Sequence, residues 1–189
     1  MNHESDRFER VLTHHGMKHF DTYSGLAKIL DYEYEPVSAY TFREVSTVED
    51  VMAHVQVATE IWNYNETARK AAFQERMNYI KFSDRRGGYM IALDGDKSIG
   101  YSNYRYSADG RVLYLNGAGV LPTYQGKGIY RGMVAKRLVE AKKRGCKVAV
   151  MQARKGTSEP IVKKLGFSEY AVFKQYIYDK GEEKFGLTE

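Results

Sequence analysis

The fold is decided by the stretch Val120-Leu121-Pro122-Thr123-Tyr124-Gln125-Gly126-Lys127-Gly128-Ile129-Tyr130-Arg131. Its apolar start ends a predicted strand, its glycines predict a turn, and a helical pattern begins at Ile129. The first N–H groups of a helix have no partner inside it, and the helix dipole places about half a positive charge there. Gly126 and Gly128 allow close backbone approach, while Lys127 and Arg131 add charge. The stretch therefore predicts an anion-binding turn.

Other glycine motifs fit this stretch less well. A Walker A loop needs a glycine where Leu121 stands, and it needs Ser or Thr where Gly128 stands. A dinucleotide fingerprint needs a third glycine and a position at the start of a fresh sheet. A plain glycine-containing loop remains the alternative for the turn taken alone.

Downstream of the turn, the pattern predicts a helix, a strand, a short helix and a last strand. The first helix has one apolar face, basic residues in its last turn, and Gly145 at its end. The later elements are expected over Lys147–Gln152, Ser158–Leu165 and Tyr170–Tyr178. A strand–helix–strand passage over residues 112–152 implies one parallel strand pair.

Upstream of the turn, the chain predicts one strand, two helices and three strands. The strand covers Tyr40–Val45, a capping box of Ser46 and Glu49 opens the first helix, and the second runs over Glu66–Phe82. The three strands are Tyr89–Leu93, Ile99–Ser107 and Val112–Leu121. Asp-Gly turns join them into an antiparallel meander. The fold class is therefore α/β, with a mixed, mostly antiparallel sheet, one parallel pair and flanking helices.

A leading segment, residues 1–38, precedes this pattern, so we expect an N-terminal helical extension followed by one domain over residues 39–189. Its apolar spacing is partly helical, and Gly16 and Gly25 divide it into two short helices. An extended connector is expected over Asp31–Pro36. The extension can pack across the domain, form a dimer contact or cover an acceptor cleft.

Composition limits the class of protein. The 189 residues carry a formal charge of +5, which suits an anionic ligand and also weak nucleic-acid binding. No run approaches the roughly 18 apolar residues of a membrane helix, and no secretory signal opens the chain. With one cysteine, Cys146, the pattern favours the cytoplasm. His15 and His19 have no acidic or cysteine ligand at metal-site spacing, so no metal is expected.

Together, two motifs resemble the GNAT family of N-acetyltransferases. The strand, Pro-x-Tyr-Gln-Gly-Lys-Gly and helix are similar to its acetyl-CoA motif. The strand Lys147–Met151 and the segment Pro160–Phe167, which ends in Leu-Gly-Phe, are similar to its next strand and helix. The element order over residues 39–179 matches as well.

The resemblance implies how acetyl-CoA would be held. Backbone N–H groups of the turn would bind the pyrophosphate, which maps to Gln125, Gly126, Lys127, Gly128, Ile129, Tyr130 and Arg131. The pantetheine arm would pair with the preceding strand at Ala118 and Val120. The two glycines of Asn116-Gly117-Ala118-Gly119 independently suggest a bulge or a close backbone approach there.

This chain departs from the family at its catalytic positions. Val162 replaces the family's frequent tyrosine acid, and Lys155 replaces a frequent asparagine. Ser158 and Tyr130 are the replacement acids considered, with Tyr124 as a further candidate; the alternative for Ser158 is a helix N-cap role shared with Thr157. No carboxylate stands in the region of Tyr114 and Asn116, and the general base is unassigned. Glu60, Glu66 and Asp50 are candidates that reach the site from the first two helices.

The resemblance implies an enzyme that transfers an acetyl group from acetyl-CoA to a primary amine, either of a small molecule or of a peptide. One alternative is a non-catalytic GNAT-like protein that binds CoA, which the missing acid and base favour. Another is a basic nucleic-acid-binding domain, which the charge alone favours; we expect neither nucleic acid nor membrane as a partner. GNAT folds serve many acceptors, so the acceptor is not identified.

Overall fold

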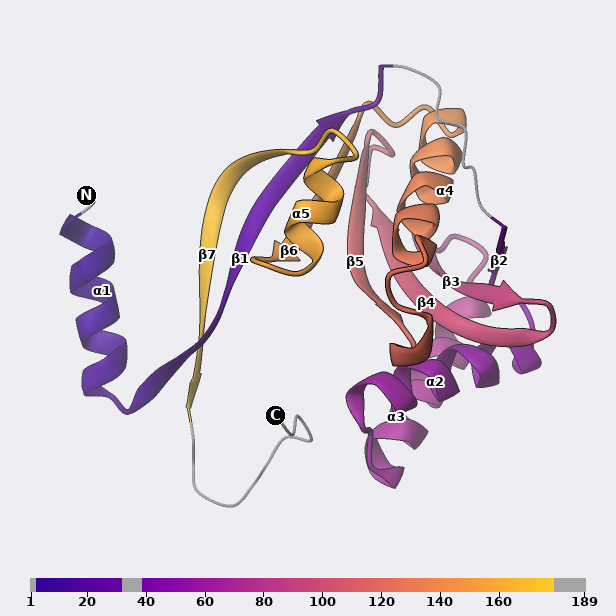
Figure 1. Ribbon diagram of the computed structural model, residues 1–189, viewed down its shortest axis with the longest axis horizontal. Helices are drawn as coiled ribbons and strands as arrows, with labels where there is room; N and C mark the ends of the chain where they lie inside the picture. Colours follow the sequence, from indigo (N-terminus) through magenta and orange to yellow (C-terminus); the bar gives the residue numbers. More distant parts are fainter. Residues whose placement is uncertain (1–2, 32–38, 179–189) are drawn as a thin grey trace.

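The computed structural model describes residues 3–31 and 39–178, and Figure 1 shows the arrangement of its elements. Within these ranges the strands form one seven-stranded sheet in the order β2-β3-β4-β5-β6-β1-β7. The elements run along the chain as α1 (His3–His14), β1 (Met17–Ile29), β2 (Thr41–Glu44), α2 (Val48–Trp62), α3 (Glu66–Ile80), β3 (Gly87–Asp94), β4 (Lys97–Tyr106), β5 (Val112–Val120), the 3₁₀ turn η1 (Pro122–Tyr124), α4 (Ile129–Lys143), β6 (Val148–Arg154), α5 (Ser158–Lys163) and β7 (Ser168–Tyr178).

The pairing of the strands confirms the predicted fold class. Strands β2, β3, β4 and β5 pair antiparallel in sequence, and β5 pairs with β6 in parallel. The predicted Asp-Gly turns lie between the strands of the meander, with Gly95 at φ 57° and Gly110 at φ 69°. Asp109 fixes the second turn because its carboxylate accepts hydrogen bonds from the Ser107 hydroxyl and the Arg111 N–H. Local turn chemistry therefore sets the register of this half of the sheet.

The leading segment differs from its prediction. α1 is the first expected helix. The prediction of a second helix is wrong, because residues 17–29 form strand β1 between β6 and β7. β6 and β7 together pair with both edges of residues 23–27, while residues 17–22 pair with β7 alone, and this long-range pairing overrides the weak helical spacing. Beyond Asp31, the expected connector lies outside the described residues. The boundary between residues 38 and 39 stays a prediction.

The start of α2 is displaced by one residue from its predicted cap. Thr47 is the N-cap, its hydroxyl accepts from the Asp50 N–H, and Asp50 completes the capping box in place of the predicted Ser46 and Glu49. Burial of Asp50 opposes its ionisation, but hydrogen bonds from the Ser46 and Thr47 N–H groups and the ion pair with Arg43 lower its pKa overall. The carboxylate thereby anchors the helix end.

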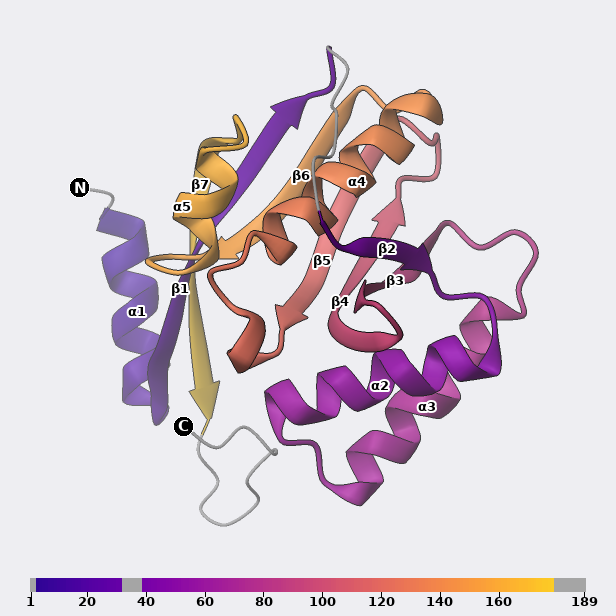
Figure 2. The ribbon, with the colours of Figure 1, turned by 45° about the vertical axis from the view of Figure 1, so that its right-hand side comes forward.

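Helices cover both faces of the sheet, as the alternation along β3 demonstrates. Ile91 packs with Val51 and Val55 of α2, whereas Ala92, the next residue, packs with Met133 of α4. Successive strand residues point to opposite faces, so α2 lies on one face and α4 on the other. Figure 2 shows α4 and α5 crossing in front of β5, β6 and β1, with α2 and α3 near the β4 end.

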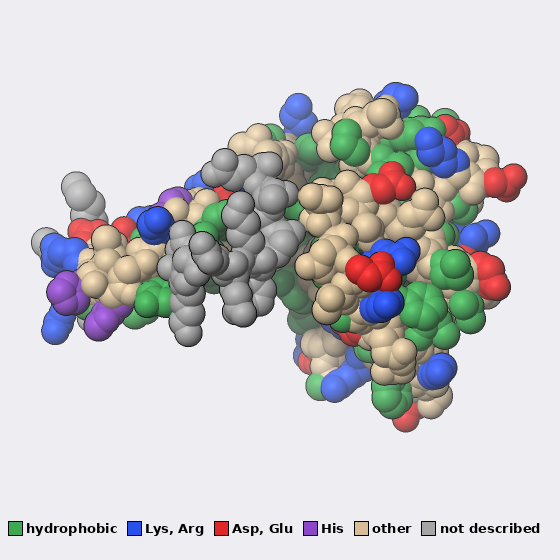
Figure 3. Space-filling model, turned by 90° about the horizontal axis from the view of Figure 1, so that it is seen from below, with side chains coloured by type: hydrophobic (Ala, Val, Ile, Leu, Met, Phe, Trp, Pro, Cys, Tyr) green, Lys and Arg blue, Asp and Glu red, His purple; other side chains and the backbone are tan. Residues whose placement is uncertain are grey.

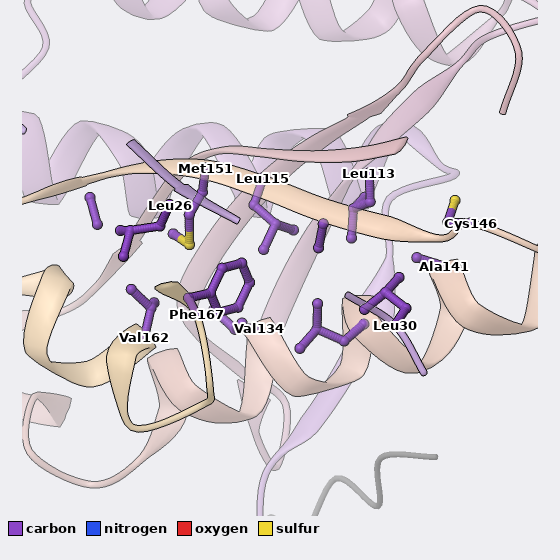
Figure 4. Packing of buried hydrophobic residues seen from close by; sticks show 13 residues of the cluster. Leu26, Leu30, Leu113, Leu115, Val134, Ala141, Cys146, Met151, Val162 and Phe167 are labelled. Atoms are coloured by element: carbon purple, nitrogen blue, oxygen red, sulfur yellow. The ribbon is translucent and has the colours of Figure 1, made fainter. Parts of the chain in front are cut away.

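The largest hydrophobic cluster joins α4 and α5 to the central strands. In Figure 4, side chains from β1, β5 and β6, among them Leu26, Leu115 and Met151, point toward Val134 of α4 and Val162 of α5. Cys146 is buried in the same cluster, as expected. The cluster fixes α4 and α5 against the strands that form the candidate site.

Candidate functional site

The predicted anion-binding turn has an open backbone. Gly126 (φ 76°) and Gly128 (φ 79°) have left-handed conformations, and a Cβ atom built on either would meet nothing within 4 Å. Gly128 is the N-cap of α4, and no side chain in the described part of the protein caps this helix start. The first N–H groups of α4 therefore face outward at an exposed turn, as an anion site requires.

Two lysines add positive charge beside this turn. The Nζ atom of Lys127 lies 4.7 Å from the ring centre of Tyr124, and that of Lys97, from β4, lies 5.2 Å from the same ring. Tyr124, from η1, thus holds two ammonium groups near the helix start by cation–π contact. The field at the turn favours a polyanion.

Next to the turn, strands β5 and β6 separate. Their parallel pairing covers Val112–Leu115 of β5 and ends there. Farther along, β5 continues with β4 alone, while β6 continues with β1 up to Arg154. The edge of residues 116–120 that faces β6 has no partner strand among residues 3–31 and 39–178, and Ala118 and Val120 lie in this stretch. An extended ligand chain can pair with such an edge.

The two glycines of β5 have different roles. Gly117 (φ 61°) is the bulged residue, because the register of β4 and β5 shifts between Asn103 and Ser102. This confirms the predicted bulge. Gly119 makes room for α2, since a Cβ atom there would lie 2.8 Å from Cδ1 of Ile61. Only the first glycine alters the strand at the separation point.

A groove of about 520 Å³ opens at the separation point. Its lining includes Tyr114, Asn116 and Gly117 of β5, Gln152 of β6, Tyr23 of β1 and Phe173 of β7. Tyr114 and Asn116 alternate with the buried Leu113 and Leu115, so the groove lies on the face opposite α4 and α5. None of the groove residues that the structure describes carries a carboxylate.

Sequence reasoning missed the contributions of β1 and β7 to the groove. Tyr23 pairs with Phe173 across these strands, and both reach the groove only because β1 lies beside β6. In the structure, exposure alternates over residues 23–30, with Ser24, Leu26 and Lys28 buried. Because two of these buried residues are polar, the sequence itself shows no alternation of apolar and polar residues that would have indicated a strand.

The structure brings the two candidate acids together. Tyr130, at the start of α4, packs against clusters from both ends of the helix, and its pKa is raised by burial, although a hydrogen bond with Ser158 opposes this. Ser158 Oγ accepts from the Arg154 N–H at 3.0 Å, and Thr157, not Ser158, is the N-cap of α5. Thr157 thus takes the N-cap position that the alternative had shared between it and Ser158, and the Ser158 hydroxyl lies beside Tyr130.

The other catalytic positions are occupied by structural contacts. Val162 is fully buried in the core, and Lys155 lies 3.7 Å from a carboxylate oxygen of Glu169. Of the proposed bases, Asp50 caps α2, and Glu66 pairs with two cations of its own helix. Glu60 is exposed, with Gln56 at 3.4 Å. None of these carboxylates lines the groove.

The residues that the structure describes include no group of three His, Cys, Asp or Glu side chains that could hold a metal ion. The same residues include no helix with the length and apolarity needed to cross a membrane.

The chain is similar to a known protein family in sequence and to solved structures in fold. The model of the family described as "Acetyltransferase (GNAT) family" matches residues 51–167. No curated protein matches the chain.

Solved structures match with low identity. A GCN5-related N-acetyltransferase from Sphaerobacter thermophilus is 15% identical, with 93% of this chain and 57% of that one covered and a TM-score of 0.70. One from Kribbella flavida is 20% identical, with 95% and 66% covered and a TM-score of 0.62. The PaiA N-acetyltransferase from Thermoplasma acidophilum, in complex with coenzyme A, is 19% identical, with 68% and 88% covered and a TM-score of 0.52. These likenesses show the fold, and the chain spans less than two thirds of the first two proteins.

Proposed function

Because the chain belongs to the GNAT acetyltransferase family, whose model matches residues 51–167, we propose that it transfers the acetyl group of acetyl-CoA to a primary amine. One observation carries this proposal: the uncapped start of α4 lies beside the point where β5 leaves β6. An anionic headgroup and an extended arm can therefore bind side by side. The relative from Thermoplasma acidophilum, solved with coenzyme A, supports the choice of ligand.

The turn and the strand edge would share the cosubstrate. Backbone N–H groups over Gln125–Arg131 would bind the pyrophosphate, with Lys127 and Arg131 adding charge. The free edge at Ala118 and Val120 would pair with the amides of the pantetheine arm, as an added strand does. The thioester would then reach the separation point, where the groove begins.

In the groove, the acceptor nitrogen would attack the thioester carbonyl carbon. The nitrogen attacks as the neutral amine, the carbon–sulfur bond breaks and the amide forms. The nitrogen releases one proton to solvent, and the departing thiolate takes one proton from an acid. Tyr130 is the proposed acid, supported by its buried hydroxyl beside Ser158 near the strand separation. A thiolate with a pKa near 8.5 leaves without strong assistance, so Tyr130→Phe should lower turnover by roughly tenfold and leave CoA binding unchanged.

The groove supports an acceptor that is a small molecule or a peptide end. Tyr23, Tyr114 and Phe173 offer ring faces, and Asn116 and Gln152 offer amides. Lys174, which also borders the groove, is paired with Glu9. The single cysteine, Cys146, is buried and has no second cysteine in the sequence to pair with, which supports our expectation of a cytoplasmic protein.

A second copy of the chain is the proposed macromolecular partner. The arm, defined as residues 3–22 and 174–178, extends beyond the end of β6 and carries α1. Phe8 of α1 is 64% exposed and Val11 is 47% exposed. Exposed charges of both signs, Asp6, Arg7 and Arg10, lie on the same helix, so charge repulsion does not forbid the packing of two arms. A helix of 12 residues needs such packing for stability.

A thermal melt with acetyl-CoA, CoA or adenosine at about 1 mM tests the proposal first. Acetyl-CoA and CoA should raise the melting temperature by several degrees, and adenosine should not, because mass action stabilises only a binding native state. A screen of primary amines with acetyl-CoA then measures free thiol release. No shift with either CoA form would contradict the proposed site.

A non-catalytic CoA-binding protein is the second candidate. It is favoured by the buried Val162, the paired Lys155 and a groove without carboxylates among its described residues. Tight CoA binding with no thiol release across the amine screen would select this candidate over the enzyme.

A further inference from the structure

A buried chain of hydrogen bonds runs from α3 through α2 to β4. Arg76 Nε donates to His54 Nδ1 at 3.1 Å, and His54 Nε2 lies 3.0 Å from Asn103 Oδ1. A guanidinium only donates, so Nδ1 is the unprotonated nitrogen of the ring. The proton is then on Nε2, which donates to Asn103. Burial and the neighbouring Arg76 charge lower the pKa of His54 to about 3, so the ring stays neutral.

These hydrogen bonds determine which way the Asn103 side-chain amide points. The two ends of an asparagine amide look alike in shape, and hydrogen bonds distinguish them. Because His54 donates, it must face the oxygen Oδ1. The nitrogen Nδ2 is therefore the end that approaches Gly117, where a Cβ atom would lie only 3.0 Å away. Gly117 is the bulged residue at the strand separation and lines the groove.

The neighbours of His54 and the backbone of Asn103 are fixed as well. His54 is fully buried between the rings of Tyr89 and Tyr101, at 5.2 Å and 4.9 Å. Arg76, 6% exposed, also donates to the Ala72 carbonyl at 2.8 Å. The backbone carbonyl of Asn103 accepts from Arg137 at 2.7 Å. Apolar residues could join these elements without the cost of burying polar groups, so the network points to a task for the amide.

Resting on the proposed function, we propose that Asn103 Nδ2 donates a hydrogen bond to the acyl carbonyl oxygen of the bound thioester, and that His54 and Arg76 are its positioning residues. The carbonyl oxygen gains negative charge as the amine attacks. A fixed donor therefore stabilises that oxygen more in the transition state than in the ground state. Asn103 transfers no proton, and its amide stays neutral throughout.

The ratio of the dissociation constants for acetyl-CoA and CoA tests this contact without an acceptor. CoA lacks the carbonyl, so only acetyl-CoA feels the donor. Asn103→Ala should weaken the binding of acetyl-CoA by roughly threefold to tenfold and the binding of CoA by less than about twofold. Asn103→Asp keeps the acceptor for His54 but presents an oxygen, which cannot donate, to the thioester carbonyl. The ratio of the two dissociation constants should therefore change at least as much as in Asn103→Ala. Asn78→Asp, on the exposed side of α3, is the matched control.

Changes at His54 separate positioning from packing. His54→Gln retains a donor toward Asn103 and an acceptor toward Arg76, so it should keep the ratio near that of the wild type. His54→Leu retains the volume and removes both bonds, so it should change the ratio as Asn103→Ala does. Calorimetric titration of folded variants gives both constants, and thermal melts confirm folding.

The outcomes are distinct. A wild type that fails to bind CoA overturns the proposed function, and this inference falls with it. If CoA binds but the ratio is unchanged in Asn103→Ala or His54→Leu, only the Asn103 contact is overturned. Equal weakening of both ligands also overturns it, because Asn103 would then merely support the pocket.

Discussion

At the scale of single residues, Gly128 is the position on which the proposed phosphate binding most depends. Its left-handed conformation (φ 79°) starts α4 in open space. A side chain there is strained and covers the N–H groups behind it. The residue therefore links backbone geometry to ligand approach.

We expect Gly128→Val to weaken CoA binding by at least about tenfold, because the branched side chain displaces a phosphate from the helix start. Gly145→Val is the matched control: Gly145 has φ 92° and open space at the other end of α4, so it reproduces the strain away from the turn. Titration calorimetry measures both. Equal affinity in a folded Gly128→Val protein would place the pyrophosphate elsewhere.

Glu44 gives the protein a distinct dependence on pH. Burial raises the pKa of Glu44 to about 7, although the Tyr104 hydroxyl and the charges of Arg85 and Arg137 oppose it. Because this pKa exceeds the unfolded value, the native state binds more protons between about pH 4.5 and pH 7. The contribution of Glu44 to stability is therefore favourable at low pH and is lost as the pH rises through this window.

We expect Glu44→Gln to flatten the fall of the melting temperature between pH 5 and pH 7.5, and to be more stable than the wild type at pH 8. Melts across this range measure the slope. Glu60→Gln, on the exposed surface of α2, controls for loss of one charge. A wild-type slope that persists in Glu44→Gln would assign the pH dependence to another group.

At the scale of elements, β1 is the strand that joins the two ends of the chain. It pairs with β6 on one edge and β7 on the other, and it buries Leu26, which is 2% exposed, as is Leu30 directly after the strand. Loss of one such leucine side chain typically costs about 2–5 kcal/mol. Residues 17–29 are therefore part of the folded unit, whatever the role of α1.

Two truncations should separate α1 from β1. Removal of residues 1–15 should leave a cooperative melt, because α1 lies on the arm outside the main clusters. Removal of residues 1–30 should abolish it, because β6 and β7 lose their shared partner. Circular dichroism with heating measures both. A cooperative melt after the longer deletion would show that residues 1–30 are a separable extension and not part of the folded unit.

At the scale of the whole molecule, the shape is uneven. Figure 3 shows the arm as a narrow projection from a thicker body, with basic, acidic, histidine and hydrophobic side chains mixed on its surface. β7 is the outer strand on this side of the sheet, and Tyr170 and Val172 on it are 76% and 50% exposed. Such an edge favours pairing with another chain.

We expect light scattering after size exclusion to give twice the monomer mass of 21.7 kDa. Phe8→Glu should shift the population toward the monomer, because it places charge on the apolar face of α1. Phe82→Glu is the control, since Phe82 is 63% exposed against 64% for Phe8 but follows α3. A wild-type mass of one chain at micromolar concentration would remove the dimer from the proposal.

The sequence by itself determined the parts that depend on neighbours along the chain. The Asp-Gly turns, the bulge at Gly117, the left-handed turn at Gly126 and Gly128, and the parallel pair around α4 all follow from local backbone chemistry and periodicity. The proposed acids Tyr130 and Ser158 were selected by their places at two helix starts, and their role stays a proposal.

Only the tertiary structure decided what depends on contacts between distant segments. The insertion of β1 between β6 and β7, the groove that Tyr23 and Phe173 thereby share, and the chain from Arg76 through His54 to Asn103 bring together residues far apart in the sequence. Local spacing carries no record of such pairing, because a strand buried on two edges satisfies its backbone through partners that its own residues do not specify.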